Sequence, residues 1–515
     1  MFRKILQFST VLLLLLSYGW SPMDTDAQSD QKNIYLPMVS TGPSFVYLPL
    51  VMKPWLNSTF GVEVQSLNET TAMRAQEAKS AWVRINALYW SGYQPNNSSE
   101  FRTNPELEQE LIKADQSGME VILIIHRTPL WAREYPDSVC GPIRSDMLDE
   151  FANFMTMVVQ KYSQPPFNVL YYELWNEPDL PVIKNKSAFN VLYYELWNEP
   201  EHPVIKNEPE TPQDESNIPY GCWGSPEADF YGGGNYADML KVVTPAMKSV
   251  NPNVKIVVGG LLLDCDPALP DEQCIPWKKK MAGYFEGILQ AGGGNYFDVV
   301  SYHAYNYYDA ETSPIQMEYE IPNWKNSGGQ VEGRLAFLRQ VMTDYGIDKP
   351  VIHSEAGLIC YSCFTFPPDY EQDKAEYVVW LYTRNWSKGI LATTWYTLDK
   401  GGWRGTGLLD AQNNPTPAFY AYKTMTNTLY GASFTREVNL WEGVTIFEFQ
   451  KGLNVWVLFS MDGNPKSINL STYATMLDIE AFDLFGNLCG TVGTDCFLQG
   501  SQLTFDLPVF LRFHK

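Results

Sequence analysis

The stretch that decides the fold is VLYYELWNEP, residues 169–178. Six of its first seven residues are apolar or aromatic, which indicates a strand buried on both faces, as in a parallel sheet covered by helices. The stretch then ends in Asn176, Glu177 and Pro178. In barrels of parallel strands the catalytic groups lie where the strands end. The stretch therefore predicts both a parallel α/β fold and a candidate catalytic carboxyl group at Glu177.

Seven more stretches of this kind surround it, and amphipathic helical patterns separate them. The expected strands are residues 60–65, 82–88, 121–126, 169–175, 256–262, 299–305, 351–355 and 391–396, and the helices between them include 106–116, 146–162, 236–250, 335–345 and 372–387. This alternation predicts an α/β fold, a (β/α)8 TIM barrel over residues 59–430. An open, doubly wound sheet is the alternative, but no glycine-rich phosphate-binding loop follows the first strand.

Helical patterning stops near residue 430. Short apolar runs with Gly, Asn and Asp turns between them follow, at residues 444–449, 455–459, 468–470, 479–485 and 503–507. This pattern predicts a small all-β sandwich domain over residues 431–515, packed on the barrel.

The N-terminus carries the pattern of a secretory signal peptide over residues 1–27. Arg3 and Lys4 supply a positive region, residues 11–16 an apolar core, and Ala27 a small residue at a suitable cleavage point. The apolar run is far shorter than the roughly 20 residues that cross a membrane; an uncleaved anchor is the alternative. We therefore expect a secreted protein with no membrane association beyond export.

Two proline-containing hexamers come next, IYLPMV at residues 34–39 and VYLPLV at residues 46–51. Separated by Ser, Thr and Gly, they are typical of a tether, which we expect over residues 28–58. A pair of edge strands is the alternative interpretation.

The eight cysteines are candidates for disulfides rather than thiol chemistry, because an exported chain meets an oxidising environment. Two pairs bracket short loops, and the other four residues form two further pairs. The expected bonds are Cys265–Cys274, Cys489–Cys496, Cys140–Cys222 and Cys360–Cys363. A zinc site is disfavoured, because there is a single Cys-x-x-Cys and no His lies near it.

Composition excludes several classes of function. The 37 Lys and Arg against 59 Asp and Glu give a net charge of −22, which disfavours nucleic acid and anionic membranes as partners. The 45% of hydrophobic residues supply a large core and exclude a disordered or fibrous protein. The 14% of aromatic residues fit an ordinary core, and they also fit sugar binding, in which ring faces stack on pyranose rings.

One segment is present twice: residues 167–188 and 189–210 are identical at 17 of 22 positions. Such similarity indicates a recent tandem copy rather than an ancient structural repeat. Only one copy can supply the fourth barrel strand. We favour the first, because it follows the preceding helix through a short Gln-Pro-Pro connection and leaves the second copy in a loop on the carboxyl-end face, where insertions are tolerated. Use of the second copy is the alternative.

Two strands that face each other across the expected barrel mouth end in glutamates. Strand four ends in Glu177, or in Glu199 if the second copy is used, and strand seven ends in Glu355. Glycoside hydrolysis needs such a pair, because one carboxyl group protonates the leaving oxygen while the other attacks the sugar or activates water. A separation of roughly 5 Å permits a covalent glycosyl intermediate, and a wider gap leaves room for water.

Trp-Asn-Glu-Pro at the end of strand four and Ser-Glu-Ala at the end of strand seven resemble the signature of clan A retaining glycoside hydrolases, most similar to glycoside hydrolase family 39 and its relatives. The resemblance spans residues 60–430 and implies that Glu177 or Glu199 is the acid/base and Glu355 the nucleophile. The substrate-binding residues that it implies are Asn176 or Asn198, Arg84, His126, His303, Tyr305 and Trp395. It implies no cofactor and no metal.

We therefore expect a secreted retaining glycoside hydrolase that cleaves O-glycosidic bonds of an oligo- or polysaccharide by a two-glutamate double displacement. The alternative is a non-catalytic carbohydrate-binding barrel whose site was disrupted by the duplication; the distance between Glu355 and the candidate acids distinguishes the two. A metal-dependent hydrolase fits less well, because five His and no His-Glu-x-x-His motif leave too few ligands.

Overall fold

The computed structural model describes most of the chain. The described residues are 34–38, 46–50, 58–97, 100–136, 140–179, 181–182, 220–224, 228–361, 363, 365–471 and 479–513. The expected signal peptide, most of the expected tether, and Asn198 and Glu199 of the second copy lie outside the described residues.

The two proline-containing hexamers form strands that pair with each other. Strand β1 (Ile34–Met38) runs antiparallel to β2 (Val46–Leu50), with Ile34 opposite Leu50. This two-stranded sheet belongs to a unit of its own, separate from residues 54–515.

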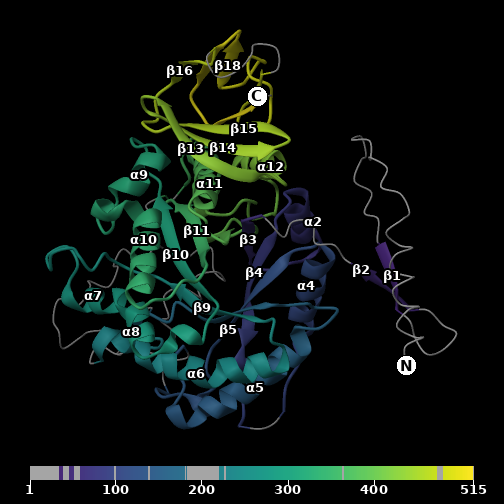
Figure 1. The fold of residues 1–515 in the computed structure, drawn as a ribbon, viewed down its shortest axis with the longest axis vertical. Coiled ribbons are helices and arrows are strands. Elements are labelled where there is room, and N and C mark those ends of the chain that lie inside the picture. The colour runs from purple at the N-terminus through teal and green to yellow at the C-terminus, as the bar shows by residue number, and fades with distance from the viewer. Residues whose placement is uncertain are drawn as a thin grey trace, which may run out of the picture. The chain divides into compact units, whose positions relative to one another are not determined.

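Eight parallel strands close into a barrel, which confirms the expected fold class and rules out the open, doubly wound sheet (Figure 1). In order around the barrel they are β3 (Phe60–Val64), β4 (Trp82–Tyr89), β5 (Glu120–His126), β6 (Tyr171–Asn176), β9 (Lys255–Leu261), β10 (Val299–Tyr307), β11 (Val351–Ile359) and β12 (Ala392–Trp395). The last strand pairs with the first, because Thr393 lies opposite Phe60. Strands β5 and β11 are buried at every position, as expected for a barrel wall covered by helices.

Helices connect the strands and cover the outside of the barrel (Figure 1). They are α2 (Glu69–Glu77), α3 (Trp90–Tyr93), α4 (Pro105–Gln116), α5 (Leu148–Tyr162), α6 (Gly233–Val250), α7 (Pro276–Ala282), α8 (Tyr284–Gln290), α9 (Pro314–Glu320), α10 (Gly329–Asp344), α11 (Tyr370–Ser387) and α12 (Pro417–Leu429). Local signals start several of them: Asn68 and Asn104 accept hydrogen bonds from the first free amides of α2 and α4.

The structure builds the fourth barrel strand, β6, from the first copy of the duplicated segment. The chain leaves the barrel after Glu177, and the short strand β7 (Pro181–Val182) pairs with β8 (Tyr220–Gly221) where the chain returns. The backbone N–H of Trp223 donates to the carbonyl of Pro178 at 2.9 Å. The two ends of the insertion are therefore held side by side.

The C-terminal part folds into two antiparallel sheets. Their strands are β13 (Ser433–Trp441), β14 (Val444–Lys451), β15 (Leu453–Ser460), β20 (Val509–Phe513) and β17 (Ile479–Phe482) in one sheet, and β16 (Lys466–Asn469), β19 (Gln502–Phe505) and β18 (Cys496–Gln499) in the other. Alternation in β14 gives the larger sheet two buried faces: Ile446 packs in the sandwich core, whereas Phe447 and Phe449 pack with the barrel core. Trp380 of α11 contacts Phe447 at a ring distance of 5.7 Å.

All four expected disulfides are formed: Cys140–Cys222, Cys265–Cys274, Cys360–Cys363 and Cys489–Cys496. Cys140–Cys222 joins the loop after β5 to the segment that returns from the insertion. Within the described part of the chain, the helices are all too short or too polar to cross a membrane.

Candidate active site

Arg84 of β4 lies at the centre of the barrel mouth with no exposed surface. Its five N–H donors meet five acceptors: Nη1 donates to Glu63 at 2.5 Å and Glu355 at 2.6 Å, and Nη2 donates to Asn176 at 2.7 Å. Nε and Nη2 hold both oxygens of Glu173, at 3.0 and 2.8 Å. One guanidinium thereby ties together strands β3, β4, β6 and β11 in the planar geometry that arginine provides.

The charges around Arg84 do not balance, because three carboxyl groups surround one cation. Burial raises the pKa of Glu63 well above its usual value; attraction to Arg84 opposes the shift, and the negative charges of Glu355 and Glu173 add to it. Glu63 therefore holds its proton more firmly than Glu355 does.

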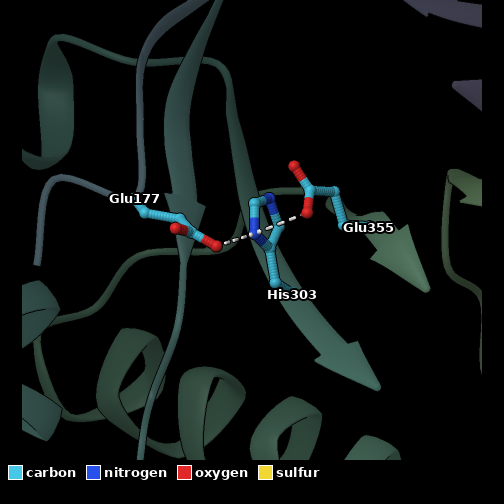
Figure 2. A group of neighbouring side chains, drawn as sticks. All are labelled: Glu177, His303 and Glu355. Atoms are coloured by element: carbon cyan, nitrogen blue, oxygen red, sulfur yellow. Dashed lines mark hydrogen bonds and ion pairs between the residues drawn. The ribbon is translucent and has the colours of Figure 1, made fainter. Parts of the chain in front are cut away.

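His303 of β10 lies between the two expected catalytic carboxyl groups (Figure 2). Its Nδ1 is 2.9 Å from Glu177 Oε1 and 3.5 Å from Glu355 Oε2. Nε2 faces Arg84 Nη2 at 3.4 Å, whereas carboxylate oxygens, which accept hydrogen bonds, surround Nδ1, so we assign the hydrogen to Nδ1, which donates to Glu177. The ligand atoms of these three side chains all lie within 4.8 Å of one another.

Glu355, on β11, is held in its ionised form. Burial would raise the pKa of this carboxyl group, but attraction to His303 and Arg84 and the hydrogen bond from Tyr305 outweigh that and keep the pKa below its usual value. The Tyr305 hydroxyl donates to Glu355 Oε2 at 2.7 Å, while Arg84 holds Oε1. Both oxygens of Glu355 are thus fixed.

The pKa of Glu177 is shifted in the opposite direction. Burial raises its pKa, the hydrogen bond from His303 opposes the shift, and the negative charge of Glu355 adds to it. Its side chain is 14% exposed, against 8% for Glu355. The two carboxyl groups of this site therefore differ as a general acid and a nucleophile must.

The backbone around β6 and β9 shapes this geometry. Trp175 and Glu177 have positive φ angles of 78° and 46°, so the chain turns sharply at the end of β6. On the neighbouring strand, a Cβ atom at Gly260 would lie 1.9 Å from His303 Nε2. Glycine at position 260 is what allows the His303 ring to occupy its place.

Two of the expected substrate-binding residues lie elsewhere than the centre of the site. His126 ends β5 and is buried with its ring edge-on to Tyr89 at 4.9 Å, and burial lowers its pKa to about 3, with the charges of Arg127 and Arg84 adding to the shift. Trp395 has no exposed surface; its indole N–H donates to the carbonyl of Thr406 at 2.6 Å. A ring buried in this way has no face for a sugar.

The next residue along the chain, Tyr396, is half-buried and lies with its ring centre 6.2 Å from that of Tyr305. Side chains alternate across a strand, so the residue after the outward-facing Trp395 turns toward the barrel mouth. Glu63 and Glu173 are the site residues that the sequence reasoning missed, and of the two aromatic rings at the end of strand eight it assigned Trp395 rather than Tyr396 to the sugar. For Glu63 and Glu173 the available signal was a charged residue inside an otherwise apolar strand.

The group of Glu177, His303 and Glu355 has the spacing of metal ligands. However, the Arg84 guanidinium lies 2.6 Å from Glu355 and repels a cation. We therefore interpret the group as paired carboxyl groups bridged by a histidine.

Comparisons with known proteins agree with this geometry. A model of the cellulase family (glycosyl hydrolase family 5) matches residues 53–399. A comparison with curated protein sequences finds no match.

Solved structures of glycoside hydrolases share the fold. A family 39 glycoside hydrolase from the gut symbiont Bacteroides cellulosilyticus WH2 superposes with a TM-score of 0.60 at 16% identity, over 91% of this chain and 84% of that one. A family 39 β-xylosidase from Caulobacter crescentus does so with a TM-score of 0.52 at 13% identity, over 90% and 97%. CelM2, a bifunctional glucanase-xylanase from a metagenome library, gives 0.54 at 13% identity, over 90% and 96%.

The resemblance to clan A glycoside hydrolases is confirmed, with family 5 as the family whose sequence model matches and family 39 among the similar folds. Because the matched residues, 53–399, make up more than half of the chain, it belongs to the cellulase family, glycosyl hydrolase family 5, and is a glycoside hydrolase.

Proposed function

We propose that the protein is a secreted retaining glycoside hydrolase, with Glu355 as the nucleophile and Glu177 as the acid/base. The observation that carries the proposal is the approach of the two carboxyl groups, whose nearest ligand atoms lie within 4.8 Å across His303. This spacing supports direct attack on the sugar rather than an inverting mechanism, in which a water lies between more widely separated carboxyl groups. It also favours an intact site over one disrupted by the duplication.

In the first step, a Glu355 oxygen attacks the anomeric carbon and the bond from that carbon to the glycosidic oxygen breaks. Glu177 donates its proton to the departing oxygen, which leaves as an alcohol. The products are a glycosyl ester on Glu355 and an ionised Glu177.

In the second step, water attacks the same carbon and gives its proton to Glu177. The ester bond breaks, Glu355 returns to its carboxylate form, and the sugar leaves with its original anomeric configuration. While Glu355 is ionised, its negative charge raises the pKa of Glu177 and keeps that group protonated. Once Glu355 is esterified, that charge is gone, the pKa of Glu177 falls, and Glu177 can act as a base.

Other side chains fit the task of holding a sugar at this pair. Arg84 fixes the orientation of Asn176 by donating to its Oδ1, which suits contact with a sugar hydroxyl beside the acid/base. Tyr305 and Tyr396 flank the nucleophile, and Trp403 lies edge-on to Tyr305 at 5.8 Å. Aromatic rings at a barrel mouth suit an oligo- or polysaccharide substrate.

The test is Glu355→Ala assayed on aryl glycosides with and without azide. We expect a loss of turnover on the order of 10⁴-fold, partial rescue by azide, and a glycosyl azide of inverted configuration as the product. The matched control is Glu120→Ala at the opposite end of the barrel strands. Full activity of Glu355→Ala would exclude the mechanism.

Export is supported by the sequence pattern of residues 1–27 and by the four disulfides. The measurement is the N-terminal sequence of protein recovered outside the cell. We expect it to begin just after Ala27; intact protein retained inside the cell would contradict export.

A further inference from the structure

Asp179 lies two residues beyond Glu177 and has no exposed surface. Both of its carboxylate oxygens lie 3.2 Å from the backbone N–H of Leu262, and Oδ2 lies 3.4 Å from the N–H of Leu263. These amides directly follow β9, the barrel strand next to β6. The carboxylate therefore bridges the ends of two adjacent strands.

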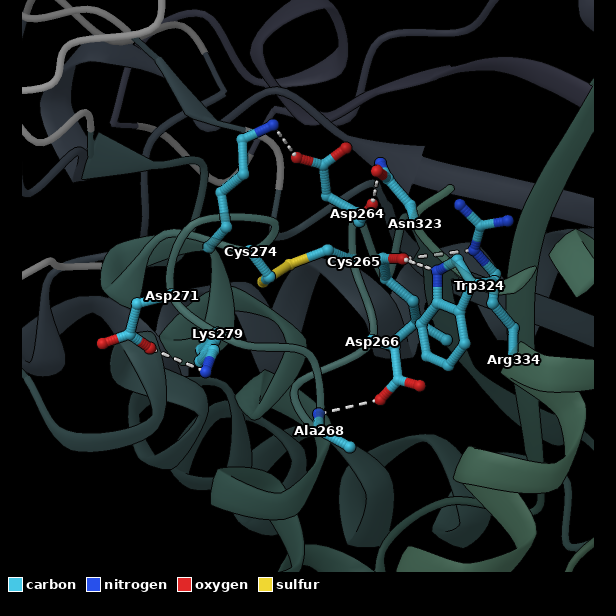
Figure 3. The surroundings of a disulfide bond; sticks show 12 residues. Asp264, Cys265, Asp266, Ala268, Asp271, Cys274, Lys279, Asn323, Trp324 and Arg334 are labelled. Atoms are coloured by element: carbon cyan, nitrogen blue, oxygen red, sulfur yellow. Dashed lines mark hydrogen bonds and ion pairs between the residues drawn. A yellow bond between two sulfur atoms is a disulfide. The ribbon is translucent and has the colours of Figure 1, made fainter. Parts of the chain in front are cut away.

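The segment that receives Asp179 is firmly held. Trp324 donates its indole N–H to the carbonyl of Leu263 at 3.0 Å, and Arg334 Nε donates to the carbonyls of Leu262 and Leu263, both at 3.2 Å. Figure 3 shows Trp324 and Arg334 beside the Cys265–Cys274 disulfide, which closes the loop that follows. Asp179 thus anchors the turn that carries Glu177 to a rigid part of the barrel rim.

The duplicated segment contains a natural variation at this position. The first copy reads Glu177-Pro178-Asp179, and the second reads Glu199-Pro200-Glu201. A glutamate is one methylene longer than an aspartate. In a fully buried site, the longer side chain must displace either the amides that it binds or the turn that carries it.

We propose that Asp179 is the positioning residue for the acid/base, and that an aspartate at this position enables the first copy, unlike the second, to hold its glutamate where it can protonate the leaving oxygen. This inference rests on the proposed role of Glu177. It assigns Asp179 no contact with the sugar: it acts by fixing the turn from which Glu177 reaches the leaving oxygen.

Two deletions give a matched pair of chains with a single copy each. Deleting residues 189–210 keeps the first copy, and deleting residues 167–188 keeps the second, so the products differ at five positions. Pairing of Pro181–Val182 with Tyr220–Gly221 holds the ends of the insertion together, and both copies contain the Pro-Val dipeptide. We therefore expect both chains to fold.

The first-copy chain should retain wild-type kcat. The second-copy chain should lose at least tenfold in kcat on glycosides with poor leaving groups, with KM changed less than threefold. Adding Glu201→Asp to it should restore kcat to within twofold, whereas the neighbouring change His202→Leu should not. Equal kcat in the two deletion chains, or a loss that Glu201→Asp leaves uncorrected, would overturn the proposal.

A leaving-group comparison separates positioning from general damage. Dinitrophenyl glycosides depart without acid assistance, so a displaced Glu177 should slow their first step little. A loss of equal size on both kinds of substrate would indicate mere structural damage and would overturn the proposal.

Full-length Asp179→Glu provides the same test if a deletion chain fails to fold. Glu177→Gln in the first-copy chain tests the proposed function separately. If that change abolishes activity while both deletion chains are equally active, the role of Asp179 alone is wrong; if it leaves activity intact, the role of Glu177 is wrong.

Discussion

Arg84 and Glu355 lie 271 residues apart in the sequence and 2.6 Å apart in the structure. The same guanidinium nitrogen also holds Glu63 at 2.5 Å. The nucleophile of the proposed reaction is therefore placed by a cation that it shares with carboxyl groups from two other barrel strands.

The first prediction concerns the pH profile of kcat/KM. Because Glu355 must be ionised and Glu177 protonated, we expect a bell shape with the acidic limb below 4.5 and the basic limb above it. Glu177→Gln should lower kcat/KM by about 10²–10⁴-fold on poor leaving groups and remove the basic limb. A basic limb that persists in Glu177→Gln would assign it to another group.

Arg84→Met should destabilise the fold strongly. The change leaves Glu63, Glu173 and Glu355 buried beside one another without their cation, which typically costs about 3–5 kcal/mol. Denaturant unfolding measures this. Arg144→Met, which removes an ion pair with Asp146, is the control, because both side chains there are more than one-third exposed and solvent screens such a pair.

Gly260→Ala should reduce kcat by at least tenfold. A Cβ atom at this position would lie 1.9 Å from His303 Nε2, so the ring must leave its place between Glu177 and Glu355. Steady-state kinetics on an aryl glycoside provides the measurement. Gly92→Ala is the matched control, since its Cβ would come no nearer than 3.9 Å to another group; comparable losses in the two variants would contradict the steric explanation.

Glu376 of α11 should make stability depend on pH. Burial raises its pKa to about 8, with the charges of Asp373 and Asp506 adding to the shift. The folded state then keeps a proton that the unfolded state releases, so the free energy of unfolding falls as pH rises from 4.5 to 8, by at most about 1.4 kcal/mol per unit. Glu376→Gln should flatten that slope, whereas Glu442→Gln, at an exposed position, should not.

Much of the architecture was predictable because the signals are local. Near-continuous apolar runs mark the barrel strands, and all eight expected ranges agree with the structure to within two residues at their first residue and four at their last. The strands of the sandwich were harder, and β13, β18 and β20 lay outside every expected range. Alternation over the four residues of β18 and the five of β20 is a faint signal, and the nine-residue β13 is mostly exposed and lacks an apolar run.

The site residues also divide into those that the sequence predicted and those that it did not. Glu177 and Glu355 stand out in the sequence because each lies in a short polar group that follows an apolar run; in the structure β11 continues to Ile359, so Glu355 lies within the strand rather than at its end. The sequence could not decide whether Trp395 or Tyr396 points into the barrel mouth, because that depends on how β12 is oriented in the barrel wall. Glu63 and Glu173 were missed, since their role depends on the hydrogen bonds that they accept from Arg84, which lies on another strand.

By itself, the sequence determined the order of strands and helices, the disulfides that close short loops and the two candidate catalytic glutamates, because each of these depends on residues close together in the chain. The tertiary structure alone decided that the first copy enters the barrel and that Arg84 gathers carboxyl groups from three other strands. The physical reason is convergence: closing the barrel brings together groups such as Arg84 and Glu355, which lie 271 residues apart, and burial then sets their charges.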